Sequence, residues 1–463
     1  MRRWFGQLAG ALGGVLLLSE ALAFAAKSSL QTVFVVPPEL RSQVEFWKSI
    51  FATYSERQVL IHDTEHLDRV YSVLDFRGLA EQVEERGRLQ RVIADAVDAE
   101  KERIRALLVR LHQADGHLDG LAPEEAKIAR LFGGDGNPRR FLDAASPDRI
   151  RAQPGLRERF AAGIEVGHRY FPEMEAIFAS EGVPIELTRL PLVESCFNVR
   201  AYSKVGAAGI WQFMPSTGRR FLRVDAVIDE RRDPIESTRA AALFLRENYE
   251  RLGTWPLALK AYNHGPAGIS RAVRELGTTD IVRIIKEYHG PAFKFASRNF
   301  YPEFLAALEV ERNRDRYFGQ LALGHPVRTE AIPLRQPISI RLAAELAGTD
   351  RDVLSDLNPS LSPLVEDGRR AIPAGYPLRL PAGTASRFSV RYADHVSRSA
   401  VTERAAQRTK GKVVRVARRS ASKKQVSTSR SNRPTRNVGK ATQRKRVRDA
   451  CNSEPQRAPF SRG

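Results

Sequence analysis

Large apolar residues return at helical spacing through the middle of the chain, and this pattern restricts the fold more than any other feature. One stripe ends at Gly182 and consists of Leu156, Phe160, Ile164, Phe171, Met174 and Phe178. A second stripe follows Asp233-Pro234, a pair typical of a helix start because aspartate can cap the first turn and proline suits its first position. Strand-like alternation is scarce, so we expect residues 151–321 to form a mainly α domain.

Residues 26–150 show the same helical periodicity. Their clearest apolar face contains Ile93, Val97, Ile104, Leu107, Leu108 and Leu111, with charged residues between them. No catalytic signature occurs here. We therefore expect a helical N-terminal region, whose role the sequence does not reveal.

Prolines become frequent after residue 325, and the helical stripes become short. Two short helices are expected at Leu342–Ala347 and Asp350–Leu357, with extended pieces near 338–340 and 378–380 on either side. This βααβ order predicts a small α+β module over residues 325–385.

The first 25 residues have the features of a signal peptide. Arg2 and Arg3 precede the apolar run Leu8–Leu18, and small residues at 21–25 offer cleavage sites. The run is short for a membrane span, and an uncleaved anchor is the alternative. No cysteine lies near the cleavage region, so we expect an exported protein of the periplasm or cell envelope that is not a lipoprotein.

Positive charge is concentrated near the end of the chain. The whole chain carries +20, and residues 401–463, with 19 basic and 3 acidic residues, carry +16. Residues 386–463 lack apolar periodicity and should be a disordered basic tail. Such a tail can bind anionic envelope polymers. A solvated tail without a partner and the product of a shifted reading frame are the alternatives. No nucleic acid is expected as a partner, because export argues against it and Phe460 is the one aromatic residue after 401.

One acidic residue, Glu194, follows the apolar run Leu190-Pro191-Leu192-Val193. Desolvation disfavours a charged carboxylate and raises its pKa, which suits a general acid near neutral pH. A glutamate in such a setting is more often a helix-end or ion-paired residue, so this stretch alone leaves both interpretations open.

Two later stretches combine glycine with polar and ring-bearing side chains. Residues 206–215 place Trp211 and Gln212 among small residues, as in loops that let a ligand approach the backbone. Residues 261–266 place tyrosine, asparagine and histidine before a turn. Taken singly, Trp211 is more often a core residue than a ligand platform, and His264 is most simply a turn residue.

The two cysteines, Cys196 and Cys451, lie far apart in the sequence. Their separation makes a disulfide framework improbable, and no metal-ligand spacing exists. We expect neither a metal nor a cofactor.

Four signatures in the central region resemble the soluble lytic transglycosylase family (SLT domain, family 1), and within it the membrane-bound lytic murein transglycosylase D type. They are Glu194-Ser195-x-Phe197-Asn198, the stretch from Gly206 to Gly218, Ala261-Tyr262-Asn263-x-Gly265, and Asn299-Phe300-Tyr301-Pro302. The resemblance covers about residues 184–308. Three features depart from the family: His264 replaces a frequent alanine, Val199 replaces a usual proline, and the lipoprotein cysteine of the D type is missing.

The resemblance implies a lysozyme-like catalytic domain that cleaves peptidoglycan between N-acetylmuramic acid and N-acetylglucosamine, which makes the enzyme a lyase. Glu194 would act first as general acid and then as base, while the C6 hydroxyl of the sugar closes a 1,6-anhydro ring. An ordinary glycosidase uses two carboxylates instead. The substrate-binding residues implied are Ser195, Gln212, Met214, Tyr262, Asn263 and Tyr301.

Two other functions stay open. A goose-type lysozyme-like hydrolase would use Asp225 or Asp229 as a second carboxylate, and an inactive peptidoglycan-binding scaffold would need no acid at all. The intact Glu194-Ser195 pair counts against the scaffold. The module at 325–385 resembles a degenerate LysM-type glycan-binding module, with a small structural appendage as the equal alternative.

Overall fold

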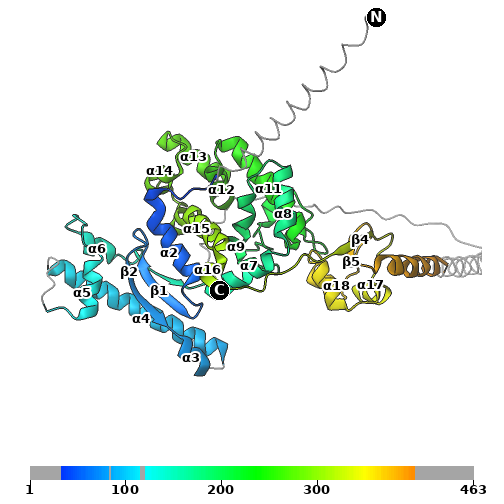
Figure 1. Ribbon diagram of the computed structural model, residues 1–463, viewed down its shortest axis with the longest axis horizontal. Coiled ribbons are helices and arrows are strands. Elements are labelled where there is room, and N and C mark those ends of the chain that lie inside the picture. Colours follow the sequence, from blue (N-terminus) through cyan, green and yellow to red (C-terminus); the bar gives the residue numbers. More distant parts are fainter. Residues whose placement is uncertain (1–32, 83–84, 115–119, 402–463) are drawn as a thin grey trace, which may run out of the picture. The chain divides into compact units, whose positions relative to one another are not determined.

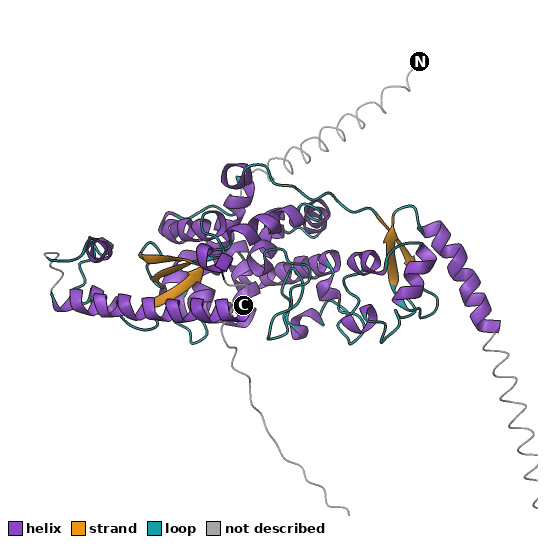
Figure 2. Cartoon of the chain, turned by 90° about the horizontal axis from the view of Figure 1, so that it is seen from below, coloured by secondary structure: helices purple, strands orange, loops and turns teal. Residues whose placement is uncertain are grey.

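The computed structural model describes residues 33–82, 85–114 and 120–401 (Figure 1). The predicted signal peptide and residues 402–463 of the tail lie outside the described residues. The chain divides into two compact units. The first extends to Val327 and includes Pro359–Ser362, and the second contains Arg328–Asn358 and the residues from Pro363 onward. Most described residues are helical (Figure 2), which confirms the expected mainly α class.

The first unit is built mainly from helices. Those before residue 154 are η1 (Pro38–Leu40), α2 (Arg41–Ala52), α3 (Arg77–Gln82), α4 (Arg86–Gln113), α5 (Pro123–Arg130) and α6 (Arg140–Ala144). Those that follow are α7 (Arg157–Gly167), α8 (Phe171–Ser180), η2 (Ile185–Arg189), α9 (Leu190–Ser195), α10 (Pro215–Gly218), η3 (Glu230–Arg232), α11 (Pro234–Leu252), α12 (Trp255–His264), α13 (Pro266–Leu276), α14 (Ile281–Glu287), α15 (Phe295–Arg312) and α16 (Arg314–Phe318). Among the described residues, no helix combines the length and apolar composition that a membrane crossing requires.

The predicted helix signals are confirmed at α11 and modified at α7 and α8. Asp233 caps α11 by accepting hydrogen bonds from the N–H groups of Ile235 and Glu236. The apolar stripe that ends at Phe178 is buried, but it belongs to two helices rather than one. The break follows Gly167, where an added Cβ would lie 2.6 Å from the ring of Phe171.

A three-stranded antiparallel sheet interrupts the region predicted to be helical. Its strands are β1 (Gln58–Asp63), β2 (Val70–Asp75) and β3 (Ile150–Pro154), in the order β2-β1-β3. The helical expectation for residues 26–150 is therefore wrong for this part. The central strand β1 is buried on both faces, so it lacks the alternation of apolar and polar residues that signals a strand.

Strand β1 separates two hydrophobic cores. Leu60 belongs to the first core, which contains apolar residues between Phe34 and Val310. Val59 and Ile61 belong to the second core, formed mainly by β1, β2, α4, α5 and α6. Successive side chains of a strand point to opposite faces, and this alternation assigns neighbouring residues of β1 to different cores.

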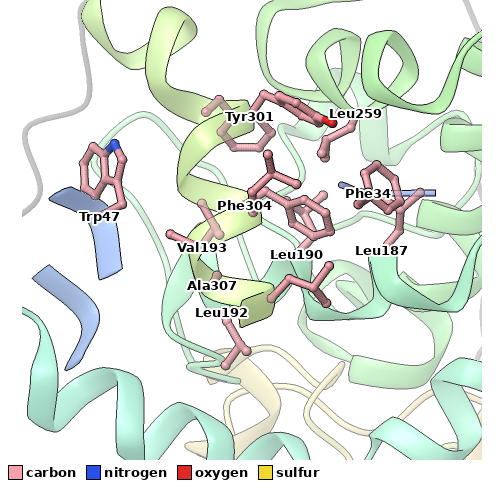
Figure 3. Packing of buried hydrophobic residues seen from close by; sticks show 14 of the residues in the cluster. Phe34, Trp47, Leu187, Leu190, Leu192, Val193, Leu259, Tyr301, Phe304 and Ala307 are labelled. Carbon is pink, nitrogen blue, oxygen red and sulfur yellow. The ribbon is translucent and has the colours of Figure 1, made fainter. Parts of the chain in front are cut away.

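Helix α2 packs along α15 and so belongs to the first core with the central domain. The indole Nε1 of Trp47 donates to Oδ1 of Asn299 at 3.4 Å. Figure 3 shows Trp47 in this core together with Val193, Tyr301 and Phe304. The predicted N-terminal region therefore does not form one core: α2 belongs to the first core, whereas the second core ends at Ile150.

The second unit contains β4 (Thr329–Pro333), α17 (Ile340–Ala347), α18 (Arg351–Leu357), α19 (Pro363–Glu366) and β5 (Pro377–Pro381). The two strands pair antiparallel and enclose the two expected helices, with the short helix α19 as an addition to the expected βααβ order. The first strand lies nine residues earlier than expected, because Ile338 forms only an isolated bridge with Ile372. The LysM-type assignment stays a prediction.

A helix follows β5, over residues 385–401. This contradicts the expectation that disorder begins at 386. Phe388 and Tyr392, one helical turn apart, are buried and stacked, and the hydroxyl of Tyr392 donates to the carbonyl of Gln336 at 2.8 Å. Two aromatic anchors thus attach the start of the predicted tail to the second unit.

Candidate active site

Glu194 lies in the last turn of α9, at the point where a buried helix ends. The residues before it, from Leu190 to Val193, are buried, whereas Glu194 itself is partly exposed. The helix stops because Cys196 and Phe197 have left-handed backbone angles, with φ of 48° and 55°. Such angles are unfavourable for residues other than glycine and persist only where surrounding structure enforces them.

Packing against α7 and α8 enforces this turn. Phe197 is buried, and its ring stacks on Tyr170 and meets the edge of Phe171. On the other side Gly163 approaches the backbone so closely that an added Cβ would lie 2.5 Å from the carbonyl oxygen of Cys196. The backbone that carries Glu194 is therefore fixed by helices from an earlier part of the sequence.

Ser195 connects α9 to the following loop. Its hydroxyl lies 3.0 Å from the carbonyl oxygen of Ile210 and 3.3 Å from that of Pro191. Both neighbours are acceptors, so the hydroxyl proton is directed to the backbone. The structure thus gives Ser195 a role in holding the loop beside Glu194.

The loop residues Trp211 and Gln212 have different environments. Trp211 is fully buried, stacks on Phe178 and donates from Nε1 to the hydroxyl of Thr238 at 2.9 Å, so it is a core residue rather than a ligand platform. Gln212 is partly exposed with a φ of 48°, and its amide donates to the carbonyl of Gly209 at 2.8 Å. The two neighbours therefore differ: Trp211 belongs to the core, whereas Gln212 is accessible to solvent in part.

Tyr262 of α12 is bonded to the loop and lies within electrostatic range of Glu194. Its hydroxyl donates to the carbonyl of Trp211 at 2.7 Å. Burial and the nearby charge of Glu194 raise the pKa of Tyr262 well above its ordinary value. The structure therefore brings Glu194, Ser195, Gln212 and Tyr262 together from three segments, and Tyr262 stays a neutral phenol.

The three other predicted site residues have different positions. Asn263 follows Tyr262 in α12 and is partly exposed. Met214 directly precedes α10 and is also partly exposed. Tyr301 is only 2% exposed and lies in the first core near Leu259 (Figure 3). Burial raises its pKa above the ordinary value. Tyr301 is therefore a core residue, and its burial does not favour the predicted contact with the substrate.

Comparison with known proteins shows which proteins the central region resembles. Residues 174–285 match the family model described as "Transglycosylase SLT domain". The "Membrane-bound lytic murein transglycosylase D" of Escherichia coli (strain K12) is 32% identical over 180 residues, which are 38% of this chain and 39% of that protein. The "Putative tributyltin chloride resistance protein" of Alteromonas sp. (strain M-1) is 40% identical over 96 residues, 20% of this chain and 46% of that protein.

The resemblance to the lytic transglycosylase family is confirmed. The chain spans less than half the length of these curated relatives. The family model covers the SLT-type region from α8 to α14, which includes Glu194, the loop at 206–215 and Tyr262. It stops before α15, although α15 packs against α9 and α12 in the same core.

Arg231 is a residue of this SLT-type region that sequence reasoning missed. Its guanidinium group is buried, pairs with both carboxylate oxygens of Asp229, and donates to the carbonyls of Gly206 and Phe213 at 2.7 and 2.9 Å. It therefore clamps both ends of the loop that contains Gln212. The charged run Asp229–Asp233 contains two arginines, and its sequence does not indicate which of them is buried.

The two aspartates considered as second carboxylates are engaged in structural bonds. Asp225 accepts hydrogen bonds from the N–H groups of Val227 and Ile228 and from Arg223. Although burial acts in the opposite direction, these bonds lower the pKa of Asp225 below its ordinary value. Asp229 forms the buried ion pair with Arg231. Both carboxylates thus stabilise the chain around η3.

Within the described residues, no group of three or more histidine, cysteine, aspartate or glutamate side chains is arranged to hold a metal ion. Cys196, next to Ser195, is partly buried. Cys451 lies outside the described residues.

Proposed function

We propose that this chain is a lytic transglycosylase that cleaves the glycan strands of murein between N-acetylmuramic acid and N-acetylglucosamine. The observation that carries the proposal is the position of Glu194. A partly exposed carboxyl group ends a buried helix and lies beside Tyr262, which is bonded to the loop that carries Gln212. The match to the SLT domain and the E. coli relative, named as a murein transglycosylase, support the substrate class.

In the proposed reaction Glu194 acts twice. The protonated carboxyl group donates its proton to the glycosidic oxygen, the bond from that oxygen to C1 breaks, and positive charge develops on the sugar ring. The ionised Glu194 then accepts the proton of the C6 hydroxyl of the same sugar, whose oxygen forms the new bond to C1. The product is a 1,6-anhydro ring, and no water is consumed.

The neighbouring residues divide into two groups in this proposal. Gln212, Asn263 and Met214 are partly exposed and are assigned to contacts with the sugars. Tyr262, whose pKa is raised, cannot compete with Glu194 as the base, so it is assigned to holding the carboxyl group in place. Ser195 and Tyr301 are assigned to the support of the site from behind.

A hydrolase of the goose-type lysozyme class is the second candidate, since water can attack C1 when a second carboxylate activates it. The bonds made by Asp225 and Asp229 favour the transglycosylase, because each carboxylate would have to leave its partners before it could act as a base. An inactive glycan-binding scaffold would not require a partly exposed carboxyl group in the last turn of α9.

The proposal includes the location and partners of the protein. We place the enzyme in the periplasm or cell envelope, exported by the segment at 1–25, with peptidoglycan strands as its substrate. The positive charge of residues 401–463 suits anionic envelope polymers. No metal or cofactor has a part in the proposed reaction.

Analysis of the products tests the reaction type. The purified chain is incubated with murein sacculi, and the released fragments are analysed by mass spectrometry. Muropeptides with 1,6-anhydro ends, lighter by one water than their reducing counterparts, are the expected result. Reducing ends alone would contradict the transglycosylase and favour the hydrolase.

Glu194→Gln tests the catalytic residue. The amide keeps the shape of the side chain but cannot donate the proton, so turnover should fall by roughly 10²–10⁴-fold, the usual contribution of general acid–base catalysis. Thermal unfolding and binding to sacculi should stay close to those of the wild type. Glu287→Gln, at an exposed position of α14, is the control and should keep full activity. Turnover of Glu194→Gln equal to that of this control would exclude Glu194 as the acid.

A further inference from the structure

A proline interrupts the hydrogen bonds of helix α15. Pro302 lies inside the helix and has no N–H group, so it cannot donate to the carbonyl four residues earlier, which is that of Arg298. The segment around it is buried, including Asn299, Phe300 and Tyr301. A carbonyl left without a donor in such surroundings destabilises the fold, so another donor is expected.

The side chain of Lys260 supplies that donor. Its Nζ lies 3.3 Å from the carbonyl oxygen of Arg298, and the residue is fully buried. Nζ also lies 5.1 Å from the centre of the Phe293 ring. Burial, followed by the charge of Arg298, lowers the pKa of Lys260, and Glu303 opposes this shift. Both the amine and the ammonium form keep N–H groups, so the bond to the carbonyl does not depend on which is present.

Lys260 lies on the opposite side of α12 from Tyr262. Two residues along a helix correspond to a rotation of about 200°, so one side of α12 contacts α15 while the other reaches Trp211 and Glu194. One turn after Lys260, the ring of His264 makes a 2.9 Å hydrogen bond with the hydroxyl of Ser297, also in α15. Helix α12 is thus attached to the start of α15 at two successive turns.

We propose that Lys260 is a positioning residue of the active site, which replaces the N–H group that Pro302 lacks and thereby fixes α12, with Tyr262, against α15. The part that concerns turnover rests on the proposed function. The hydrogen bond from Lys260 to the carbonyl that Pro302 leaves without a helical donor does not rest on the proposed function. It is a property of the fold and can be measured without substrate.

A double-mutant cycle tests the pairing. Lys260→Met keeps the length of the side chain but has no donor, and Pro302→Ala restores the missing N–H. Unfolding of the full chain in urea is measured for both single variants and the double variant. We expect Lys260→Met to lower the midpoint strongly when Pro302 is present and much less when alanine replaces it. Pro266→Ala is the matched control, because the N–H of a first helical residue has no helical acceptor and its return should not reduce the cost of Lys260→Met.

Turnover of murein tests the positioning role. We expect kcat of Lys260→Met to fall roughly 10-fold, on the scale of losses from slightly misplaced catalytic groups, with KM within about twofold. Pro302→Ala should restore much of this loss. A residue that only stabilises the fold would lower the urea midpoint and leave kcat of the folded enzyme unchanged.

Three outcomes would overturn the inference. If Lys260→Met lowers the urea midpoint equally in the wild-type and Pro302→Ala backgrounds, the lysine does not replace the N–H group that Pro302 lacks. An unchanged kcat would remove the positioning role. If Lys260→Met does not fold, failure of Pro302→Ala to restore folding would likewise contradict it, whereas restored folding would support it. Absence of murein turnover in the wild type would instead reject the proposed function, and the stability cycle would still decide the pairing.

Discussion

The two cores on either side of β1 are built in different ways. The second core comes from one stretch of sequence, Val59 to Ile150, and packs regular helices on a sheet. The first core collects segments from Phe34 to Val310 and contains the turns around Glu194. Those turns include three non-glycine residues with left-handed angles, Cys196, Phe197 and Gln212. Packed side chains account for the second core. The first core also depends on packed side chains, but close contacts between backbone segments shape it as well.

Gly209→Ala tests the close backbone contacts around the site and should lower the free energy of unfolding more than the other substitutions. An added Cβ would lie 1.8 Å from the carbonyl oxygen of Arg231, and the φ of 74° is unfavourable for alanine. We expect a loss of unfolding free energy of roughly 4 kcal/mol, from the backbone angle and the displaced loop together. Urea unfolding measures the loss. Gly253→Ala has a similar φ of 79° and open space around the position, so it isolates the angle and should cost only about 1–2 kcal/mol. Equal losses would mean that the contact with Arg231 contributes nothing.

Leu60→Ala and Ile61→Ala compare the two cores within one strand. Both side chains are fully buried, and each substitution should cost about 3 kcal/mol through lost burial and a cavity. They should differ in activity. Leu60→Ala disturbs the core that contains residues of α2, α15 and the helix α9 that ends beside Glu194, so kcat of the folded enzyme should fall, while Ile61→Ala should leave it unchanged. Assays at a temperature where both variants are folded separate these effects. A matching loss of kcat in Ile61→Ala would show that the two cores act as one.

His62, on the face of β1 toward the first core, is held in its neutral form. Its ring packs on Phe46, and Nδ1 lies 2.8 Å from the carbonyl oxygen of Asp63, so Nδ1 must carry the hydrogen. The other nitrogen, Nε2, is buried without a hydrogen-bond partner among the described residues, and its protonation would leave a buried N–H unpaired. Burial lowers the pKa of His62 from 6.5 to about 4.

This lowered pKa predicts a loss of stability in mild acid. Between pH 6.5 and 4 the unfolded chain binds a proton at His62 and the folded chain does not, so the stability present above pH 6.5 decreases as the pH falls. The loss should reach about 2 kcal/mol at pH 5. Urea midpoints measured from pH 8 to 4.5 should show it. His62→Gln should reduce the slope, whereas His66→Gln, at an exposed position in the next turn, should not. Identical slopes in the wild type and His62→Gln would contradict the prediction.

Some features of the site followed from local sequence. The start of α11 at Asp233 required only a capping side chain followed by proline. The apolar run before Glu194 predicted a buried segment that ends in a carboxyl group. The order of the four signatures indicated the family, because each signature is a short stretch that can be recognised without knowing the fold.

Other features required contacts between distant residues. The hydroxyl of Ser195 and the indole of Trp211 have ordinary structural partners, at Ile210 and Thr238, that their signatures do not reveal. Tyr301 had been assigned to the substrate, but it is enclosed by the first core. Arg231 is followed directly by a second arginine, Arg232, that is less buried, and nothing in the local sequence tells the two apart, so the clamp of Arg231 on the loop could not be predicted.

The sequence by itself determined the mainly α class, the helix ends marked by aspartate, proline and glycine, and the presence of one carboxyl group in an apolar segment. These properties depend on neighbours within a few positions, where periodicity and capping act. Only the tertiary structure decided that β1 divides two cores, that Gly163 fixes the turn after Glu194, and that Lys260 lies at the gap left by Pro302. Each of these depends on which segments pack together, and long-range packing sets both the burial of a side chain and the partner of a backbone group.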